Sequence, residues 1–138
     1  MKKKEIKEEL IRNLLSQAEQ ALQNAYVPYS NYPVGAAMKT KDGETFTGCN
    51  VENASYGLTN CAERTAIFKA VSHGYRDIQV MAVVSNSERH ASPCGACRQV
   101  ISEFSDDAIL ILANKDGDYQ IVKASELLPG AFTAQELE

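Results

Sequence analysis

The chain has 138 residues and a formal net charge of −4, and its lysines and arginines are scattered along it. Nucleic-acid-binding proteins gather positive charge against phosphates, so this composition disfavours a nucleic-acid partner and favours a small free substrate. No apolar run approaches the about 20 residues of a membrane span and no signal-peptide pattern follows the N-terminus, so we expect a cytoplasmic protein without a membrane partner, forming one domain over residues 1–138.

The first segment has the pattern of an amphipathic helix from Lys3 to about Ala25, because apolar residues recur there at three- and four-residue steps. The prolines of residues 26–33 then predict an ordered loop. Two strands follow, Val34–Met38 and Thr45–Val51, and the Asp42-Gly43 turn joins them as a hairpin.

The rest of the chain predicts further helices and strands in alternation. A helix is expected from Cys61 to about Ser72, with Thr59 or Asn60 as its cap and Gly74 at its end. The later elements are a strand Val80–Ser85, a helix Cys94–Phe104 after Pro93, strands Ile109–Ala113 and Tyr119–Lys123, and a helical turn Ala124–Leu128. This order predicts the α/β class, as a three-layer α/β/α fold with a five-stranded mixed sheet.

Two short motifs, Cys61-Ala62-Glu63 and Pro93-Cys94-Gly95-Ala96-Cys97, each open a predicted helix. Three thiolates can hold a zinc ion and leave its fourth tetrahedral position open, as in catalytic zinc sites. Water at that position ionises near neutral pH, and Glu63 is placed to move protons. Arg64 is expected to hydrogen-bond ligand sulfurs and offset their negative charge. The motifs therefore predict metal-assisted hydrolysis of an exocyclic amine, with one zinc ion per chain.

Other interpretations of the cysteines stay open. The Cys94-Gly95-Ala96-Cys97 stretch alone is compatible with a redox pair, which would leave the first motif unexplained. A closed structural zinc site needs a fourth ligand, for which Cys49, His73 and His90 are the candidates, although their surroundings are more typical of a buried small hydrophobe and of solvated histidines. A zinc-binding interaction module without catalysis would leave the carboxylate of the first motif without a role.

The two motifs and several longer stretches resemble the cytidine deaminases of free nucleosides, in their small three-cysteine form. The resemblance extends over nearly the whole chain. Its zinc motifs are shared by a wider deaminase superfamily. Its more specific stretches are Asn50-Val51-Glu52-Asn53 and Pro129-Gly130-Ala131-Phe132.

The resemblance implies zinc-dependent hydrolysis of cytidine and deoxycytidine to uridine and deoxyuridine, with release of ammonia, in pyrimidine salvage. It implies that Cys61, Cys94 and Cys97 bind zinc. It also implies that Glu63 takes a proton from the attacking water and delivers protons to N3 and to the departing amine. The backbone near Ala62 is expected to orient the base.

Asn50 and Glu52 correspond to the ribose clamp of this family. Both alternate with Val51 at a predicted strand end, so we expect them on one side, where an amide and a carboxylate can bind sugar hydroxyls. Ordinary turn chemistry is the alternative for Asn50. Tyr32 occupies the position of a phenylalanine that usually packs on the pyrimidine, and its hydroxyl departs from the family pattern.

In tetrameric relatives, residues matching Ala54, Tyr56 and Phe132 enter a neighbouring subunit's site. The resemblance therefore implies a homotetramer with shared sites. A second function stays open: deamination of a cytosine nucleoside antibiotic such as blasticidin S, whose deaminases share the zinc motifs and the size. The Asn50 and Glu52 pair favours ordinary nucleosides over this alternative.

Overall fold

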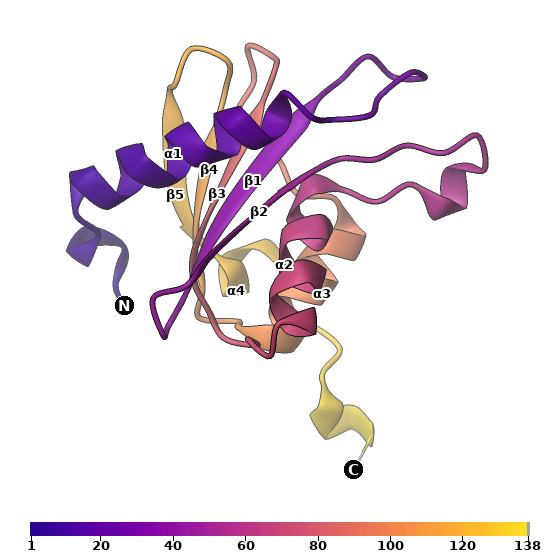
Figure 1. The fold of residues 1–138 in the computed structure, drawn as a ribbon. Helices are drawn as coiled ribbons and strands as arrows, with labels where there is room; N and C mark the ends of the chain where they lie inside the picture. Colours follow the sequence, from indigo (N-terminus) through magenta and orange to yellow (C-terminus); the bar gives the residue numbers. More distant parts are fainter. Residues whose placement is uncertain (138) are drawn as a thin grey trace.

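Five strands form one mixed sheet in the computed structural model, which describes residues 1–137 (Figure 1). The strand order is β2-β1-β3-β4-β5, in which β3 and β4 pair in parallel and the other neighbours pair antiparallel. The strands are β1 (Val34–Thr40), β2 (Thr45–Cys49), β3 (Ile78–Ser85), β4 (Ile109–Ala113) and β5 (Tyr119–Lys123). The predicted five-stranded mixed sheet is confirmed.

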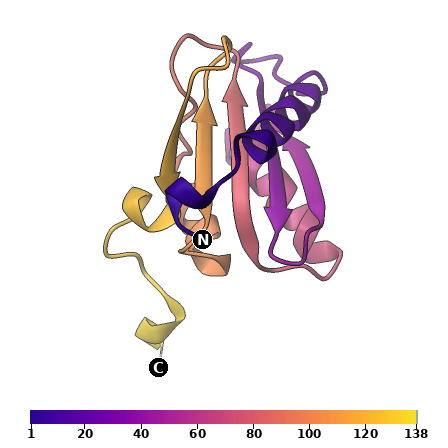
Figure 2. The same cartoon turned by 90° about the vertical axis from the view of Figure 1, so that its left-hand side faces the viewer.

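Helices cover both faces of this sheet, which confirms the three-layer prediction. Helix α1 crosses one face, and α2, α3 and α4 lie on the other (Figures 1 and 2). The helices are α1 (Glu8–Leu22), α2 (Ala62–Ser72), α3 (Gly95–Phe104) and α4 (Ala124–Leu127), with 3₁₀ turns at Lys3–Glu5, Tyr56–Leu58 and Ala134–Leu137. Among residues 1–137, no helix combines the length and the apolar composition that crossing a membrane requires.

The central strand β3 is apolar on both faces because it lies between two helical layers. Val80 and Ala82 pack in the cluster that contains Leu14 of α1, whereas Met81 and Val83 pack in the cluster on the opposite face. This alternation follows from the two-residue period of a strand. The two clusters together hold the helices against a rigid sheet.

Two glycines let helices approach the sheet closely. A Cβ atom on Gly35 would lie 1.9 Å from the carbonyl oxygen of Ala18 in α1. A Cβ atom on Gly48 would lie 2.5 Å from the amide nitrogen of Ala66 and 2.6 Å from the carbonyl oxygen of Ala62. The absence of a side chain at Gly48 therefore fixes how the first turn of α2 rests on β2.

Several predicted boundaries were wrong. The first helix begins at Glu8 and not at Lys3, since Ile6 and Lys7 have extended backbone angles. The strand predicted to reach Val51 ends at Cys49, because the Asn50 side chain turns back to the Val34 amide.

The predicted cap of α2 was also wrong. Cys61 is the N-cap residue, while the Thr59 hydroxyl accepts from the Asn53 amide and the Asn60 side chain donates to the Thr65 hydroxyl.

The prediction of a single domain over 1–138 includes Glu138, which lies outside the described residues, and it stays a prediction.

Candidate active site

The three motif cysteines lie at the N-terminal ends of two helices. Cys61 is the N-cap residue of α2, Cys94 is the N-cap residue of α3, and Cys97 lies in the first turn of α3. Helix α2 leads into β3, whereas α3 follows β3 and leads into the parallel strand β4. This connectivity places both helix N-termini near the C-terminal end of the central strand β3. The partial positive charge of helix N-termini favours thiolates there.

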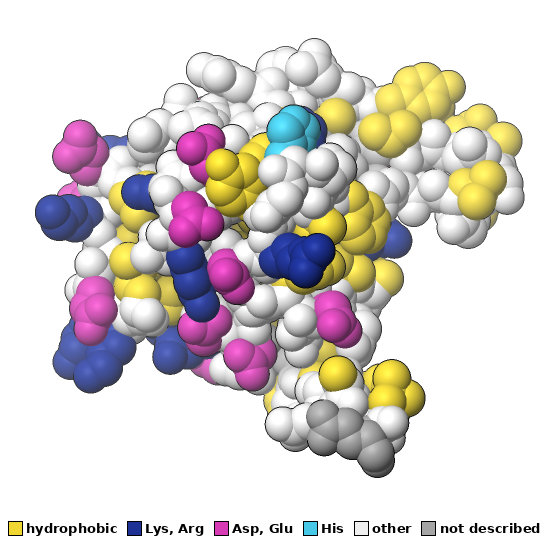
Figure 3. All heavy atoms as spheres, turned by 60° about the horizontal axis from the view of Figure 1, so that its bottom comes forward, with side chains coloured by type: hydrophobic (Ala, Val, Ile, Leu, Met, Phe, Trp, Pro, Cys, Tyr) yellow, Lys and Arg dark blue, Asp and Glu magenta, His cyan; other side chains and the backbone are white. Residues whose placement is uncertain are grey.

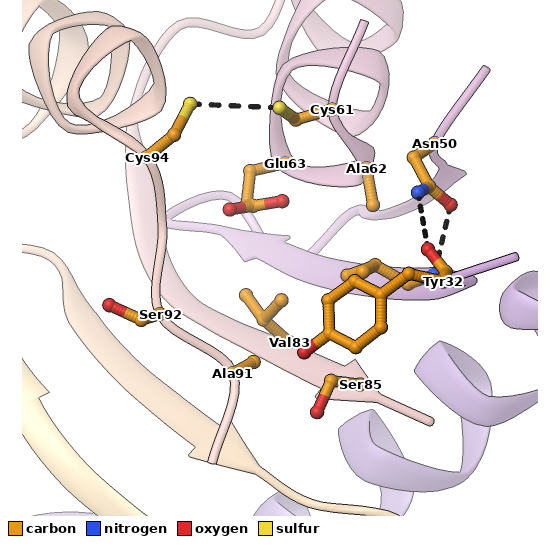
Figure 4. A pocket seen from close by; sticks show the side chains of 11 residues that line it. Tyr32, Asn50, Cys61, Ala62, Glu63, Val83, Ser85, Ala91, Ser92 and Cys94 are labelled. Atoms are coloured by element: carbon orange, nitrogen blue, oxygen red, sulfur yellow. Dashed lines mark hydrogen bonds between the residues drawn. The ribbon is translucent and has the colours of Figure 1, made fainter. Parts of the chain in front are cut away.

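The sulfur atoms of Cys61, Cys94 and Cys97 all lie within 4.8 Å of one another. Cys61 Sγ and Cys94 Sγ are 3.6 Å apart (Figure 4). Zinc–sulfur bonds of about 2.3 Å in a tetrahedron require sulfur atoms about 3.8 Å apart, so this donor set fits a zinc ion with one position left for another ligand.

The candidates for a closed four-ligand site lie elsewhere. Cys49 is on β2, and the His73 ring packs on Phe46 at a centroid distance of 5.4 Å. Neither these two residues nor His90 belongs to the metal-binding group that the described part of the chain forms. The geometry therefore favours a site with three protein ligands over a closed structural one.

Hydrogen bonds between the thiols shift the pKa values of two of them in opposite directions. The pKa of Cys61 is lowered to about 5, first because the Cys97 thiol hydrogen-bonds to it and further because Arg64 does. The pKa of Cys97 is raised, because its thiol is the partner in that bond and because it is buried. One thiolate is thus already favoured at neutral pH, which suits a cluster that must lose protons to bind metal.

Glu63 points into the cavity beside the cysteines (Figure 4). Its side chain is buried, with the residue 4% exposed, and burial raises its pKa to about 7. A carboxyl group with this pKa populates both protonation states at neutral pH, which suits a group that accepts and then returns a proton.

Arg64 hydrogen-bonds to one sulfur atom of the cysteine cluster. Such a bond to the ligand sulfurs was expected from the sequence. Its Nη2 atom donates to Cys61 Sγ at 3.3 Å, and its Nε atom is buried and without a partner among the described residues. A cation against a thiolate ligand reduces the negative charge of the cluster and orients its sulfur.

We predict that Arg64→Gln weakens zinc retention and turnover, each by about 10–100-fold, the usual cost of losing such a supporting contact. Arg64→Lys keeps the positive charge but not the planar fork, so we expect it to recover only part of the loss. Metal content after dialysis against a chelator and the steady-state turnover rate measure the two effects. Full zinc and unchanged turnover in Arg64→Gln would exclude a role for the guanidinium.

A cavity of about 180 Å³ opens beside the cysteines and Glu63. Its walls come from the loop before β1, the ends of β2 and β3, and the starts of α2 and α3 (Figure 4). The lining residues are Tyr32, Val34, Asn50, Cys61, Ala62, Glu63, Val83, Ser85, Ala91, Ser92 and Cys94. This volume is below the about 300–1,000 Å³ of whole-ligand pockets, so it suits one ring and not a complete nucleoside.

The structure separates the two residues of the expected ribose clamp. Asn50 lines the cavity, and its amide also binds the loop before β1, accepting from the Val34 amide at 2.9 Å and donating to the Tyr32 carbonyl at 2.9 Å. Glu52 lines a neighbouring depression together with Tyr29. The Tyr32 ring forms part of the cavity wall next to Asn50 (Figure 4).

The residues expected to serve a neighbouring subunit lie on the surface. Ala54 is exposed, Tyr56 is 77% exposed and Phe132 is 59% exposed, and none of them lines the chain's own cavity, although Tyr56 lines the depression that contains Glu52. Figure 3 shows hydrophobic side chains gathered on the loops that project beyond the sheet and near the C-terminus.

Sequence reasoning missed several residues that build the cavity. Ser85 and Ala91 form its floor as buried residues at the end of β3 and in the following loop. The Arg98 side chain donates to the Pro93 carbonyl at 2.7 Å and the Leu127 carbonyl at 3.0 Å, which joins the start of α3 to the C-terminal segment. The position of Arg98 directly after the second motif was the available signal.

Three thiols at two helix N-termini beside a buried glutamate match the zinc nucleobase deaminases, in which His/Cys/Cys or three cysteines hold the metal and a glutamate that is not a ligand transfers protons. Comparison with protein-family models agrees: residues 8–113 match the cytidine and deoxycytidylate deaminase zinc-binding region. The chain belongs to this family.

Individual relatives are similar over most of their length. The chain is 56% identical over 125 residues to the cytidine deaminase of Halalkalibacterium halodurans, covering 90% of this chain and 95% of that protein. It superposes on the crystal structure of cytidine deaminase from Burkholderia pseudomallei with a TM-score of 0.85 and 50% identity, covering 88% of this chain and 98% of that one. The blasticidin-S deaminase of Bacillus cereus is more distant, at 34% identity over 112 residues, with 75% and 79% of the two chains covered.

Proposed function

We propose that this chain catalyses the hydrolysis of cytidine and deoxycytidine to uridine and deoxyuridine with release of ammonia, as a zinc-dependent cytidine deaminase. One observation carries the proposal: three cysteine sulfurs within 4.8 Å of one another lie beside the buried carboxyl group of Glu63 in a single cavity. When bound there, zinc supplies a Lewis acid that makes a water molecule acidic near neutral pH.

Glu63 performs the proton transfers. Its carboxylate takes a proton from the attacking water as the new C4–O bond forms, and the resulting carboxylic acid delivers a proton to N3 of the ring. The carboxylate then takes the proton of the new C4 hydroxyl group and passes it to the amine, so that the C4–N bond breaks, the C4 carbonyl forms and ammonia leaves. One residue serves both steps because each proton that the carboxylate takes up is released again before the next one is taken, and burial already raises its pKa toward neutral pH.

The cavity holds the pyrimidine ring, and the sugar lies toward its mouth. The size of the cavity supports this orientation, because about 180 Å³ suits one ring. The backbone near Ala62, at the first residue of α2, orients the base, and Tyr32 packs on it. Asn50 at the cavity wall and Glu52 beyond it recognise the sugar.

Further copies of the chain complete the site in a homotetramer. The exposure of Ala54, Tyr56 and Phe132 outside the chain's own cavity supports this assembly, since exposed side chains are available for contact with a neighbouring copy. We also propose a role in pyrimidine salvage in the cytoplasm. The four cysteines are free thiols, which supports a reducing compartment.

The fall in ultraviolet absorbance of cytidine on mixing with the purified protein tests this function. We expect cytidine and deoxycytidine to be converted with comparable kcat/KM, and blasticidin S to be converted far more slowly. Efficient conversion of blasticidin S with no conversion of cytidine would assign the alternative function. An absence of conversion for all three would contradict deamination of this substrate class.

A further inference from the structure

The loop between α1 and β1 is fastened at both ends to the segment that follows β2. Near its start, the Tyr26 amide donates to the Asn50 carbonyl at 3.0 Å, and the Tyr26 carbonyl accepts from the Glu52 amide at 2.8 Å. Near its end, the Val34 carbonyl accepts from the Asn50 amide at 3.3 Å. In the middle of the loop, which carries Tyr32 into the cavity wall, the Asn31 amide donates to the Val27 carbonyl at 3.0 Å and the Pro33 carbonyl accepts from the Asn86 amide at 3.3 Å. The link from this part of the loop to the segment after β2 is made by side chains.

Ser30 is the centre of those side-chain contacts. The Glu52 carboxylate accepts from the Tyr29 amide at 3.0 Å, from the Ser30 amide at 3.1 Å and from the Ser30 hydroxyl. The oxygen of the same hydroxyl accepts from the Tyr32 amide at 3.1 Å. Asn31, between these residues, has a φ of 55°. Asparagine adopts this left-handed conformation more readily than most other non-glycine residues, and the surrounding hydrogen bonds hold the turn in it.

We infer that Ser30 is a positioning residue for substrate binding, because its hydroxyl joins the carboxylate of Glu52 to the backbone of Tyr32. The inference rests on the proposed function, in which Glu52 meets the sugar and Tyr32 meets the base. The hydroxyl fixes the orientation of the Glu52 carboxylate and, through the Tyr32 amide, the position of the Tyr32 ring at the cavity wall. The positions of Glu52 and Tyr32 are thereby coupled to each other.

The hydrogen bonds of Ser30 lead to this loop and to Glu52, whereas Glu63 and the metal ligands belong to α2 and α3. Loss of the hydroxyl therefore disturbs binding and not the proton transfers. In Ser30→Ala we expect KM for cytidine to rise about tenfold, as for the loss of one hydrogen bond to a charged group, with kcat unchanged.

The test compares KM and kcat of the wild type, Ser30→Ala and Ser30→Thr with cytidine and with 2′,3′-dideoxycytidine. Ser30→Thr keeps the hydroxyl, so we expect it to restore KM. The dideoxy substrate offers no secondary hydroxyl to Glu52, so its KM in Ser30→Ala is expected to rise less, about threefold. Ser16→Ala on the exposed side of α1 is the matched control and should behave as the wild type.

A KM for cytidine in Ser30→Ala equal to that of the wild type would overturn the inference. A parallel fall in kcat and thermal stability that Ser30→Thr does not rescue would also overturn it, since that pattern indicates a merely structural role. A wild-type protein that deaminates neither substrate would instead refute the proposed function, so the two failures are distinguishable.

Discussion

Glu63→Ala is expected to lower kcat for cytidine by about 10²–10⁴-fold, the usual contribution of general acid–base catalysis. The residue is 4% exposed and burial raises its pKa to about 7, so both its environment and its position beside the cysteines suit proton transfer. It is not a member of the three-sulfur group, so we expect the variant to keep one zinc ion per chain. Steady-state kinetics and elemental analysis on the same sample measure both expectations.

Two further variants sharpen this test. Glu63→Gln keeps the shape of the side chain and one acceptor oxygen but cannot take up and release a proton, so it should lose about as much activity as the alanine variant. Glu44→Gln, at the exposed β1–β2 turn, makes the same chemical change away from the cavity and should retain full activity. A Glu63→Ala variant that turns over cytidine normally would remove this residue from the mechanism.

Cys94→Ala is expected to lose zinc and activity together and to unfold at a lower temperature. The change removes one of three sulfurs, and a pair of thiolates no longer provides the donor set that catalytic zinc requires. Because the folded chain presents the ligands ready for the ion, binding energy adds to folding stability, and its loss lowers the melting temperature. Elemental analysis and thermal unfolding with and without added zinc measure these effects.

Cys49→Ala is the matched control for this experiment. Cys49 is also a free cysteine, but it lies on β2 and outside the sulfur group. We expect this variant to keep zinc and activity. A Cys94→Ala protein with full zinc and full activity would contradict the assignment of Cys94 as a ligand.

The sheet and its helical layers could be predicted because they follow from local patterns. The strand predicted at Val80–Ser85, which is part of β3, and the Asp42-Gly43 turn between β1 and β2 each depend on neighbours within a few residues. The sulfur group could be predicted for a related reason. Each motif opens a helix, and an N-cap position directs its side chain beyond the helix end.

The misplaced boundaries depend on contacts between distant parts of the chain. Lys3 was expected in the first helix, but its ammonium group pairs with Glu126 beyond β5, and the acidic pair Glu8 and Glu9 opens the helix instead. Acidic residues stabilise a helix N-terminus and lysines do not, which favours a helix start at Glu8. The pairing of Lys3 with Glu126 agrees with this start, because it holds Lys3 outside the helix. No local pattern in the sequence reveals that partner.

The placement of the proposed sugar-binding residues was harder to predict for the same reason. Alternation around Val51 suggested that Asn50 and Glu52 face one side, but the strand ends at Cys49 and Val51 instead forms bridges with Tyr26 and Asn60. The alternation argument requires a continuing strand. Their separation into a cavity and a neighbouring depression is thus a property of the folded loops.

The proposed catalysis depends on a zinc ion held by three cysteine sulfurs with one position left for a non-protein ligand. X-ray absorption at the zinc edge, on purified protein whose activity toward cytidine has been measured, tests it most directly. We expect about one zinc per chain with three sulfur neighbours at about 2.3 Å and one lighter neighbour. Active protein without zinc, or zinc surrounded by four side-chain ligands, would contradict it.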